Sequence, residues 1–210
     1  MKYLLIAAAM LMGFTPVKDK GGKKGAWINM FDGKSLNGWK VGDNAATFSV
    51  ENGAIMVHGP KAHLFYMGES GHQDFKDFEF QARVMTTPGS NSGIYFHTEY
   101  QEKNWPDKGF EVQVNNSHTD WKRSGSLYDI KEVKDLYVKD NEWYTTYIRV
   151  KGKHVIIRLN GKTVLDYTEP EGFVAPADHP GRNISSGTFA LQGHDPKSKV
   201  YFKDLKVRKL

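Results

Sequence analysis

The sequence is built from short runs in which apolar and polar residues alternate, separated by glycine, asparagine and proline. Such alternation places every second side chain on one face of a strand, so it predicts strands with one buried face. No window of a dozen residues has a convincing apolar period of 3.6 residues, which disfavours long helices. The runs cover residues 48–50, 54–58, 75–86, 92–100, 109–115, 143–150, 155–159, 163–167, 187–192 and 199–209. They predict an all-β fold of the sandwich type.

The N-terminal residues are typical of an export signal. Lys2 precedes an almost wholly apolar run at residues 4–14, which is too short to span a bilayer but matches the apolar core of a signal peptide. Residues 17–25 are rich in lysine and glycine. We therefore expect a signal peptide and flexible lead-in at residues 1–25, and a single β-sandwich domain at residues 26–210. The predicted location is periplasmic or secreted.

The chain contains no cysteine. Attachment as a bacterial lipoprotein, which needs a lipid-modified cysteine, is therefore excluded, and the fold must be held by core packing without disulfides. No other stretch approaches transmembrane length, so we expect no integral membrane segment once the signal is removed.

The net charge of +5 does not indicate a nucleic-acid partner. The positive residues are scattered, apart from a lysine cluster at residues 18–24 beside the predicted leader. No zinc-finger, helix-turn-helix or RNA-binding signature is present. Nothing in the pattern predicts the oligomeric state.

Three predicted strands have an apolar face backed by a face rich in amides, imidazoles and tyrosine. In residues 110–115, Glu111 and Gln113 lie opposite the valines; Tyr95 and His97 share a face of residues 94–99; Gln192 and His194 share a face of residues 189–194. Amides both donate and accept hydrogen bonds, which suits a surface that binds hydroxyl groups. The alternative is that these strands are amphipathic but not adjacent.

The spacing of possible metal ligands gives only weak evidence for a metal site. No histidine pair has the spacing of a metal site on a predicted helix, although His58 with His63, or His194 with Asp195, could ligate an ion. A divalent cation is therefore possible but not required. Nucleophile-elbow, P-loop and dinucleotide-binding signatures are absent.

Several blocks together resemble one bacterial family, long called domain of unknown function 1080 and now described as 3-keto-disaccharide hydrolase. The blocks are FDGKSLNGW at 31–39, NSGIYF at 91–96, EVQV at 111–114, SGSLY at 124–128, LQGH at 191–194 and VYFKDL at 200–205. They occur in the family's order across residues 26–210. The resemblance implies a concanavalin A-like jelly-roll sandwich of two antiparallel sheets. The family often has a basic residue shortly after NSG, where this chain has His97.

An ordinary retaining glycosidase needs two carboxyl groups about 5 Å apart. The strand at 110–115 offers only Glu111; Glu99 and Asp120 are alternatives for the second carboxyl group, but no spacing requires either. The activity implied by the resemblance avoids this need. When C3 of a sugar is a ketone, a single base can remove the C2 proton, the C1 substituent leaves by elimination, and water then adds back.

The resemblance and the polar faces together suggest roles. The base is Glu111 or a neutral histidine; Gln113, Asn91 or a bound cation polarises the ketone; and His194 or His97 gives a proton to the leaving oxygen. Sequence alone does not rank these assignments. The expected substrate-binding residues are Asn91, Tyr95, Gln113, Tyr128 and Gln192.

The competing hypothesis is a non-catalytic, lectin-like carbohydrate-binding module, because the same fold and polar face would serve binding. Tyr95, Tyr128, Trp105 and Trp121 would then stack on sugar rings.

Overall fold

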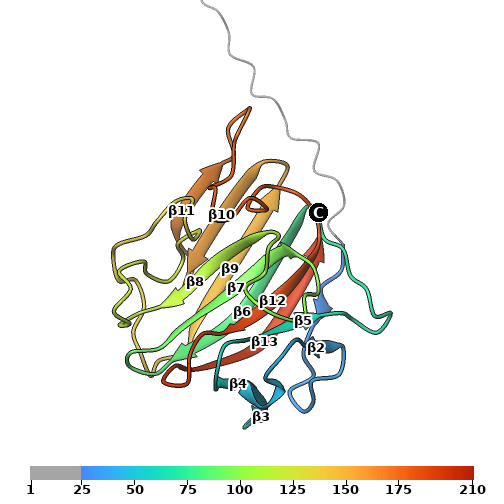
Figure 1. Ribbon diagram of the computed structural model, residues 1–210, viewed down its shortest axis with the longest axis vertical. Coiled ribbons are helices and arrows are strands. Elements are labelled where there is room, and N and C mark those ends of the chain that lie inside the picture. Colours follow the sequence, from blue (N-terminus) through green and yellow to red (C-terminus); the bar gives the residue numbers. More distant parts are fainter. Residues whose placement is uncertain (1–24) are drawn as a thin grey trace, which may run out of the picture.

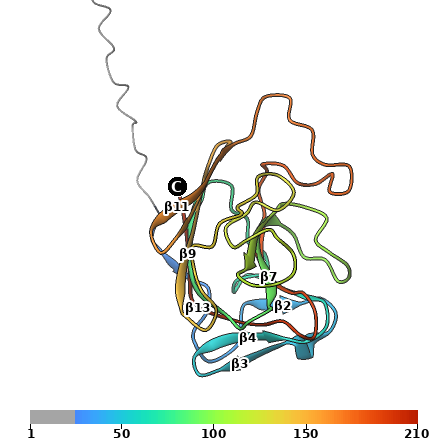
Figure 2. The same cartoon turned by 90° about the vertical axis from the view of Figure 1, so that its left-hand side faces the viewer.

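The computed structural model describes residues 25–210, so the predicted leader lies outside the described residues. Two antiparallel sheets face each other, as Figure 2 shows nearly edge-on. The order of the larger sheet is β11-β10-β9-β6-β13-β4-β3, with β1 also pairing with β13. Its strands are β1 (Ile28–Asn29), β3 (Phe48–Glu51), β4 (Ala54–His58), β6 (Phe78–Thr86), β9 (Tyr144–Lys151), β10 (His154–Leu159), β11 (Lys162–Thr168) and β13 (Lys199–Lys209).

The smaller sheet lies in front in Figure 1, and its strand order is β2-β5-β12-β7-β8. Its strands are β2 (Trp39–Val41), β5 (Ala62–Tyr66), β7 (Asn91–Thr98), β8 (Phe110–Asn115) and β12 (Thr188–Gly193). The described helical structure is one short 3-10 turn, η1 (Ala45–Thr47). The predicted concanavalin A-like sandwich is confirmed.

An aromatic core holds the two sheets together. Phe80 of β6 stacks on Phe189 of β12 with ring centroids 4.9 Å apart, and Phe78 meets the same ring edge-on. These side chains are fully or almost fully buried. The residues that sequence alternation assigned to the apolar faces of β6, β7, β8 and β12 therefore form the centre of the sandwich.

The outer face of the smaller sheet is also buried. Every residue of β7, β8 and β12 is buried, including the polar ones. Figures 1 and 2 show why: the long loops that follow β7, β8 and β11 gather over this side of the sheet. The polar face predicted from sequence is thus the floor of a covered site. Among the described residues, no helix is long and apolar enough to cross a membrane.

Candidate functional site

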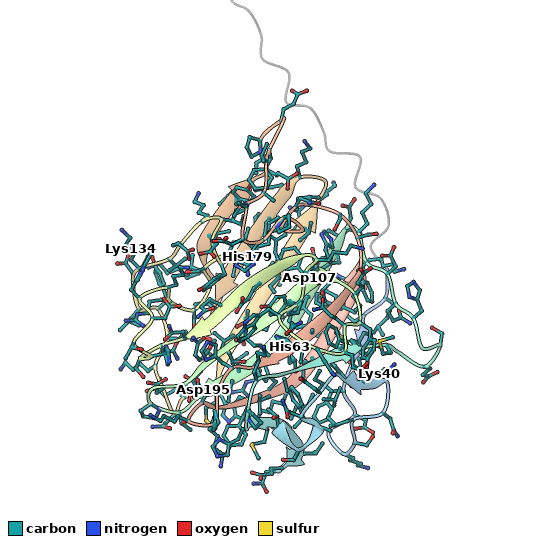
Figure 3. The ribbon with its side chains drawn as sticks, viewed as in Figure 1. Lys40, His63, Asp107, Lys134, His179 and Asp195 are labelled. Carbon is teal, nitrogen blue, oxygen red and sulfur yellow. The ribbon has the colours of Figure 1, made fainter. Side chains whose placement is uncertain are left out.

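A cleft of about 220 Å³ opens on the loop-covered side of the smaller sheet. Strands β7, β8 and β12 provide its floor, and the loops provide its walls. In Figure 3, the labelled His63, His179 and Asp195 all lie over this sheet, with His179 and Asp195 on opposite sides of the floor strands. The residues that line the cleft are Asn91, Tyr95, Trp105, Glu111, Gln113, Asp120, Tyr128, His179, Arg182, Gln192 and His194.

Strand register brings the central polar residues together. Tyr95 of β7 pairs with Glu111 of β8, and Gly93 pairs with Gln113. On the other side of β7, Ala190 of β12 pairs with Tyr95, so Gln192 comes alongside. The three polar faces are therefore adjacent, and the alternative of amphipathic strands that lie apart does not apply.

Glu111 lies at the centre of the hydrogen-bond network in the cleft floor and is only 4% exposed. The Tyr95 hydroxyl donates to Oε2 at 2.9 Å, and Gln192 Nε2 donates to Oε1 at 2.9 Å. Burial raises the pKa of the Glu111 carboxyl, while nearby Arg182 and these two hydrogen bonds act in the opposite direction. The result is a fixed carboxyl group that is more basic than an exposed glutamate.

Gly93 makes room for this carboxylate. A Cβ at position 93 would lie 2.5 Å from Glu111 Oε1 and 2.8 Å from Glu111 Cγ. Real Cβ atoms essentially never come closer than 3.0 Å to such an atom. The glycine of the NSG block therefore has a spatial role: it allows the Glu111 side chain to lie across the neighbouring strand.

Arg182 supplies the positive charge beside Glu111. Its Nη2 lies 3.7 Å from Glu111 Oε2, its Nη1 lies 3.9 Å from Asp129 Oδ2, and Nη1 also donates to the Tyr128 carbonyl. The arginine is 4% exposed. A buried guanidinium held from several sides is a fixed electrostatic group facing the cleft.

His194 and Asp195 form a second proton-transfer group. His194 Nδ1 lies 2.7 Å from Asp195 Oδ2, and Asp195 also accepts from the Ser198 hydroxyl and from two backbone amides. Burial opposes the charge on Asp195, but the His194, Ser198 and Lys197 hydrogen bonds hold its pKa at about 2. An ionised carboxylate on Nδ1–H leaves Nε2 of His194 as the nitrogen that can exchange a proton.

A metal ion has one candidate position within residues 25–210, where ligand atoms of His118, His194 and Asp195 lie within 4.8 Å of one another. Two imidazoles and a carboxylate suit a transition metal. However, Nδ1 of His118 accepts from the Asp120 amide at 3.1 Å, which leaves the proton of the neutral ring on Nε2. Both carboxylate oxygens of Asp195 already take part in hydrogen bonds, with His194, Ser198 and the Lys197 amide. The hydrogen bonding thus fits a histidine–carboxylate pair better than a cation.

Two amide oxygens in the cleft floor have no partner. Gln113 Oε1 and Gln192 Oε1 are both buried and accept no hydrogen bond, although Gln113 Nε2 donates to Asn91 Oδ1 at 2.9 Å. Buried acceptors without partners are rare and costly. A ligand hydroxyl or an ordered water that donates to them would relieve this cost.

Of the eight site residues predicted from sequence, seven line the cleft: Asn91, Tyr95, Glu111, Gln113, Tyr128, Gln192 and His194. His97 does not. Its ring packs edge-on against Phe78 and its Nε2 lies 2.9 Å from the Lys76 carbonyl. His97 has φ of 57°, beside a register shift in the pairing of β7 with β12, so a bulge interrupts the alternation that predicted its direction. The structure thus places His97 outside the cleft lining, which disfavours its assignment as the donor of a proton to the leaving oxygen.

Sequence reasoning missed Arg182 and His179, which come from the irregular segment between β11 and β12. It also missed strand β5, whose buried His63 has its ring centroid 5.5 Å from that of Tyr95 in the cleft lining. His58 is the last residue of β4 in the larger sheet, and its Nδ1 lies 3.1 Å from the Ser198 carbonyl oxygen. Tyr95 is 1% exposed and cannot act as a stacking platform.

Comparison with known proteins agrees with this architecture. A curated 3-keto-disaccharide hydrolase of Bacteroides thetaiotaomicron is 28% identical over 170 residues, which cover 67% of this chain but only 58% of that protein. This chain thus matches little more than half the length of that relative.

Solved structures show the same fold. A candidate glycosyl hydrolase from Parabacteroides distasonis has a TM-score of 0.74 at 23% identity, covering 88% of this chain and 94% of that one. The carbohydrate-binding module CBM66 of Bacillus subtilis has a TM-score of 0.58 at 15% identity, covering 80% and 93%.

The family model described as the 3-keto-alpha-glucoside-1,2-lyase-like domain matches residues 26–208, which is nearly all of the described chain. The chain belongs to this family.

Proposed function

We propose that this protein cleaves the glycosidic bond of 3-keto-glycosides by elimination followed by hydration, with Glu111 as the base. The observation that carries the proposal is a buried carboxylate with a raised pKa, fixed by Tyr95 and Gln192 at the floor of a cleft. Family membership and the relative named 3-keto-disaccharide hydrolase support this substrate class.

Glu111 takes the proton from C2 of the keto sugar, and the electron pair of the C–H bond forms an enolate with the C3 carbonyl. The Arg182 guanidinium, beside Glu111, stabilises the negative charge that develops. Arg182 thus takes the polarising role that sequence analysis gave to Gln113, Asn91 or a cation.

The enolate then re-forms the ketone, a double bond forms between C1 and C2, and the bond from C1 to the leaving oxygen breaks. His194, oriented through Nδ1 by Asp195, gives the proton to this oxygen. Addition of water across the double bond places a hydroxyl on C1 and a proton on C2, which completes a net hydrolysis.

Hydroxyl recognition is assigned to the amides. Gln113 and Gln192 line the cleft and each carries a buried oxygen acceptor without a partner, and Asn91 is hydrogen bonded to Gln113. Sugar hydroxyls are the donors that such a site needs.

The test compares aglycone release from a 3-keto-glucoside and from its unoxidised parent, using the wild type and Glu111→Gln. We expect release from the keto sugar alone, lowered by about 10²–10⁴-fold in the variant. Equal release from both sugars would contradict elimination. Tight binding of both without release would instead establish the lectin-like module.

A further inference from the structure

The cleft is too small to enclose a disaccharide. Its volume of about 220 Å³ lies below the roughly 300–1,000 Å³ of pockets that surround a whole drug-sized ligand. If one sugar ring occupies the floor at Glu111, the group attached through the leaving oxygen must lie on the rim.

A row of aromatic rings, which we call the aromatic rim, lies beside the cleft: Trp105 and His194, which line it, and His118, which packs edge-on against His194. The centroids of Trp105 and His194 are 5.7 Å apart, and those of His194 and His118 are 5.6 Å apart. Trp105 lines the cleft and is 38% exposed. Exposed aromatic surface beside a cleft is available to a ligand.

Trp105 is held in place by the ring of His63 and by hydrogen bonds within its own loop. The edge of the buried His63 ring meets it with centroids 5.5 Å apart, and Gln101 Nε2 donates to the Trp105 carbonyl at 2.9 Å. Gln101 Oε1 also accepts from the Asp107 amide, which closes the loop around the tryptophan. The exposed ring is therefore supported in one position, as a binding platform requires.

The opposite wall cannot serve in the same way. Lys122 Nζ lies 3.6 Å from the centroid of the Tyr128 ring, and the Arg182 guanidinium lies 5.0 Å from it. Two cations thus occupy the surface of that ring. Over Trp105, Lys61 Nζ is farther away, at 5.2 Å.

We propose that Trp105 and the aromatic rim form the subsite for the leaving group of the substrate, and that this subsite favours a second sugar ring or another cyclic aglycone over a small alkyl group. This inference rests on the proposed function, because it places the reacting ring at Glu111. It also agrees with the contact between the rings of His194 and Trp105, because His194 is the proposed proton donor to the leaving oxygen.

The test uses two substrates that share the 3-keto-glucosyl ring, one a disaccharide and the other a methyl glycoside. For Trp105→Ala, we expect the ratio of kcat/KM values, disaccharide over methyl glycoside, to fall about tenfold, with the change mainly in KM. The matched control is Trp121→Ala. Trp121 is 50% exposed and does not line the cleft, so this variant should leave the ratio unchanged.

An equal loss of kcat/KM for both substrates in Trp105→Ala would overturn the subsite and indicate that Trp105 only maintains the shape of the cleft. An unchanged ratio would overturn it as well. If the wild type cleaves neither substrate, the proposed function fails, and the subsite is then judged by calorimetric binding. It stands if the wild type binds the 3-keto-disaccharide more tightly than 3-keto-glucose and Trp105→Ala removes the difference; it falls if the difference is absent or persists.

Discussion

Substitution of Gly93 by alanine tests the spatial relation on which the site depends. A Cβ there would lie 2.5 Å from Glu111 Oε1, 2.8 Å from its Cγ and 3.0 Å from its Cδ. Ordinary contact begins at 3.4 Å. The carboxylate must therefore move by close to 1 Å, because Gly93 lies in the paired strand β7 and the backbone cannot yield freely.

The size of the effect follows from the contacts that Glu111 would lose. A hydrogen bond to a charged group contributes about 1.5–3 kcal/mol. Loss of one such bond, either to Tyr95 or to Gln192, corresponds to roughly 10–150-fold in rate if it is lost in the transition state. A misplacement of about 1 Å in an active site is known to cost about 100-fold. We therefore expect kcat to fall between 10-fold and 100-fold on a 3-keto-glycoside.

The loss of stability should be small enough to leave the variant folded. Overpacking costs about 1–3 kcal/mol, and replacing glycine by alanine in an extended conformation returns about 0.4–1 kcal/mol through the unfolded state. At about 2–4 °C per kcal/mol for a domain of this size, Tm should fall by no more than about 10 °C. Thermal unfolding followed by circular dichroism measures this change and shows that the variant is folded in the assay.

A double-mutant cycle identifies the cause. Glu111→Asp removes one methylene and so withdraws the side chain from the added methyl group. Gly93→Ala should then cost little further activity in the Glu111→Asp background, giving a coupling free energy of about 1 kcal/mol or more. Strictly additive losses, or full activity in Gly93→Ala alone, would refute the reasoning.

Three further predictions concern charge and metal. Glu111 must be unprotonated to act, and burial raises its pKa above 4.5, so kcat/KM should rise with pH through an inflection above 4.5. Arg182→Gln removes the positive charge that lowers this pKa and should move the inflection to higher pH. An inflection that does not move would contradict the pairing of Glu111 with Arg182. Asp195→Asn should lower turnover by about 100-fold or more because His194 loses its orienting carboxylate, while substrate affinity measured by calorimetry stays within a few-fold. Chelator treatment should leave turnover unchanged; loss of activity that an added divalent cation restores would instead make His118, His194 and Asp195 metal ligands.

Much of the site could be predicted because it lies on regular strands. Alternation in β8 separates Glu111 and Gln113 from the valines, and the structure keeps this separation. Register then brings Tyr95 beside Glu111. In these strands a period of two residues is enough to assign a side chain to a face.

Sequence analysis misplaced or missed residues where the two-residue alternation is interrupted or where the chain forms no strand with one exposed face. His97 follows the alternation in sequence but adopts a left-handed conformation at a bulge, which no local pattern indicates. Strand β5 was missed because all five of its residues are buried, so its polar His63 does not alternate with exposed positions. Arg182 comes from an irregular segment, and its place beside Glu111 depends on how a loop folds over the sheet.

The most direct test of single-base elimination is the fate of the hydrogen on C2. A 3-keto-glycoside deuterated at C2 is cleaved in ordinary water, and both the released 3-keto-glucose and the recovered substrate are examined by mass spectrometry. We predict that the product loses deuterium, that the recovered substrate retains it in an enzyme-free control, and that Glu111→Gln abolishes the loss together with cleavage. Product that keeps its deuterium at C2, together with equal kcat/KM for the deuterated and ordinary substrates, would show that the bond to C1 breaks without removal of the C2 proton, and would contradict the assignment of Glu111 as the base.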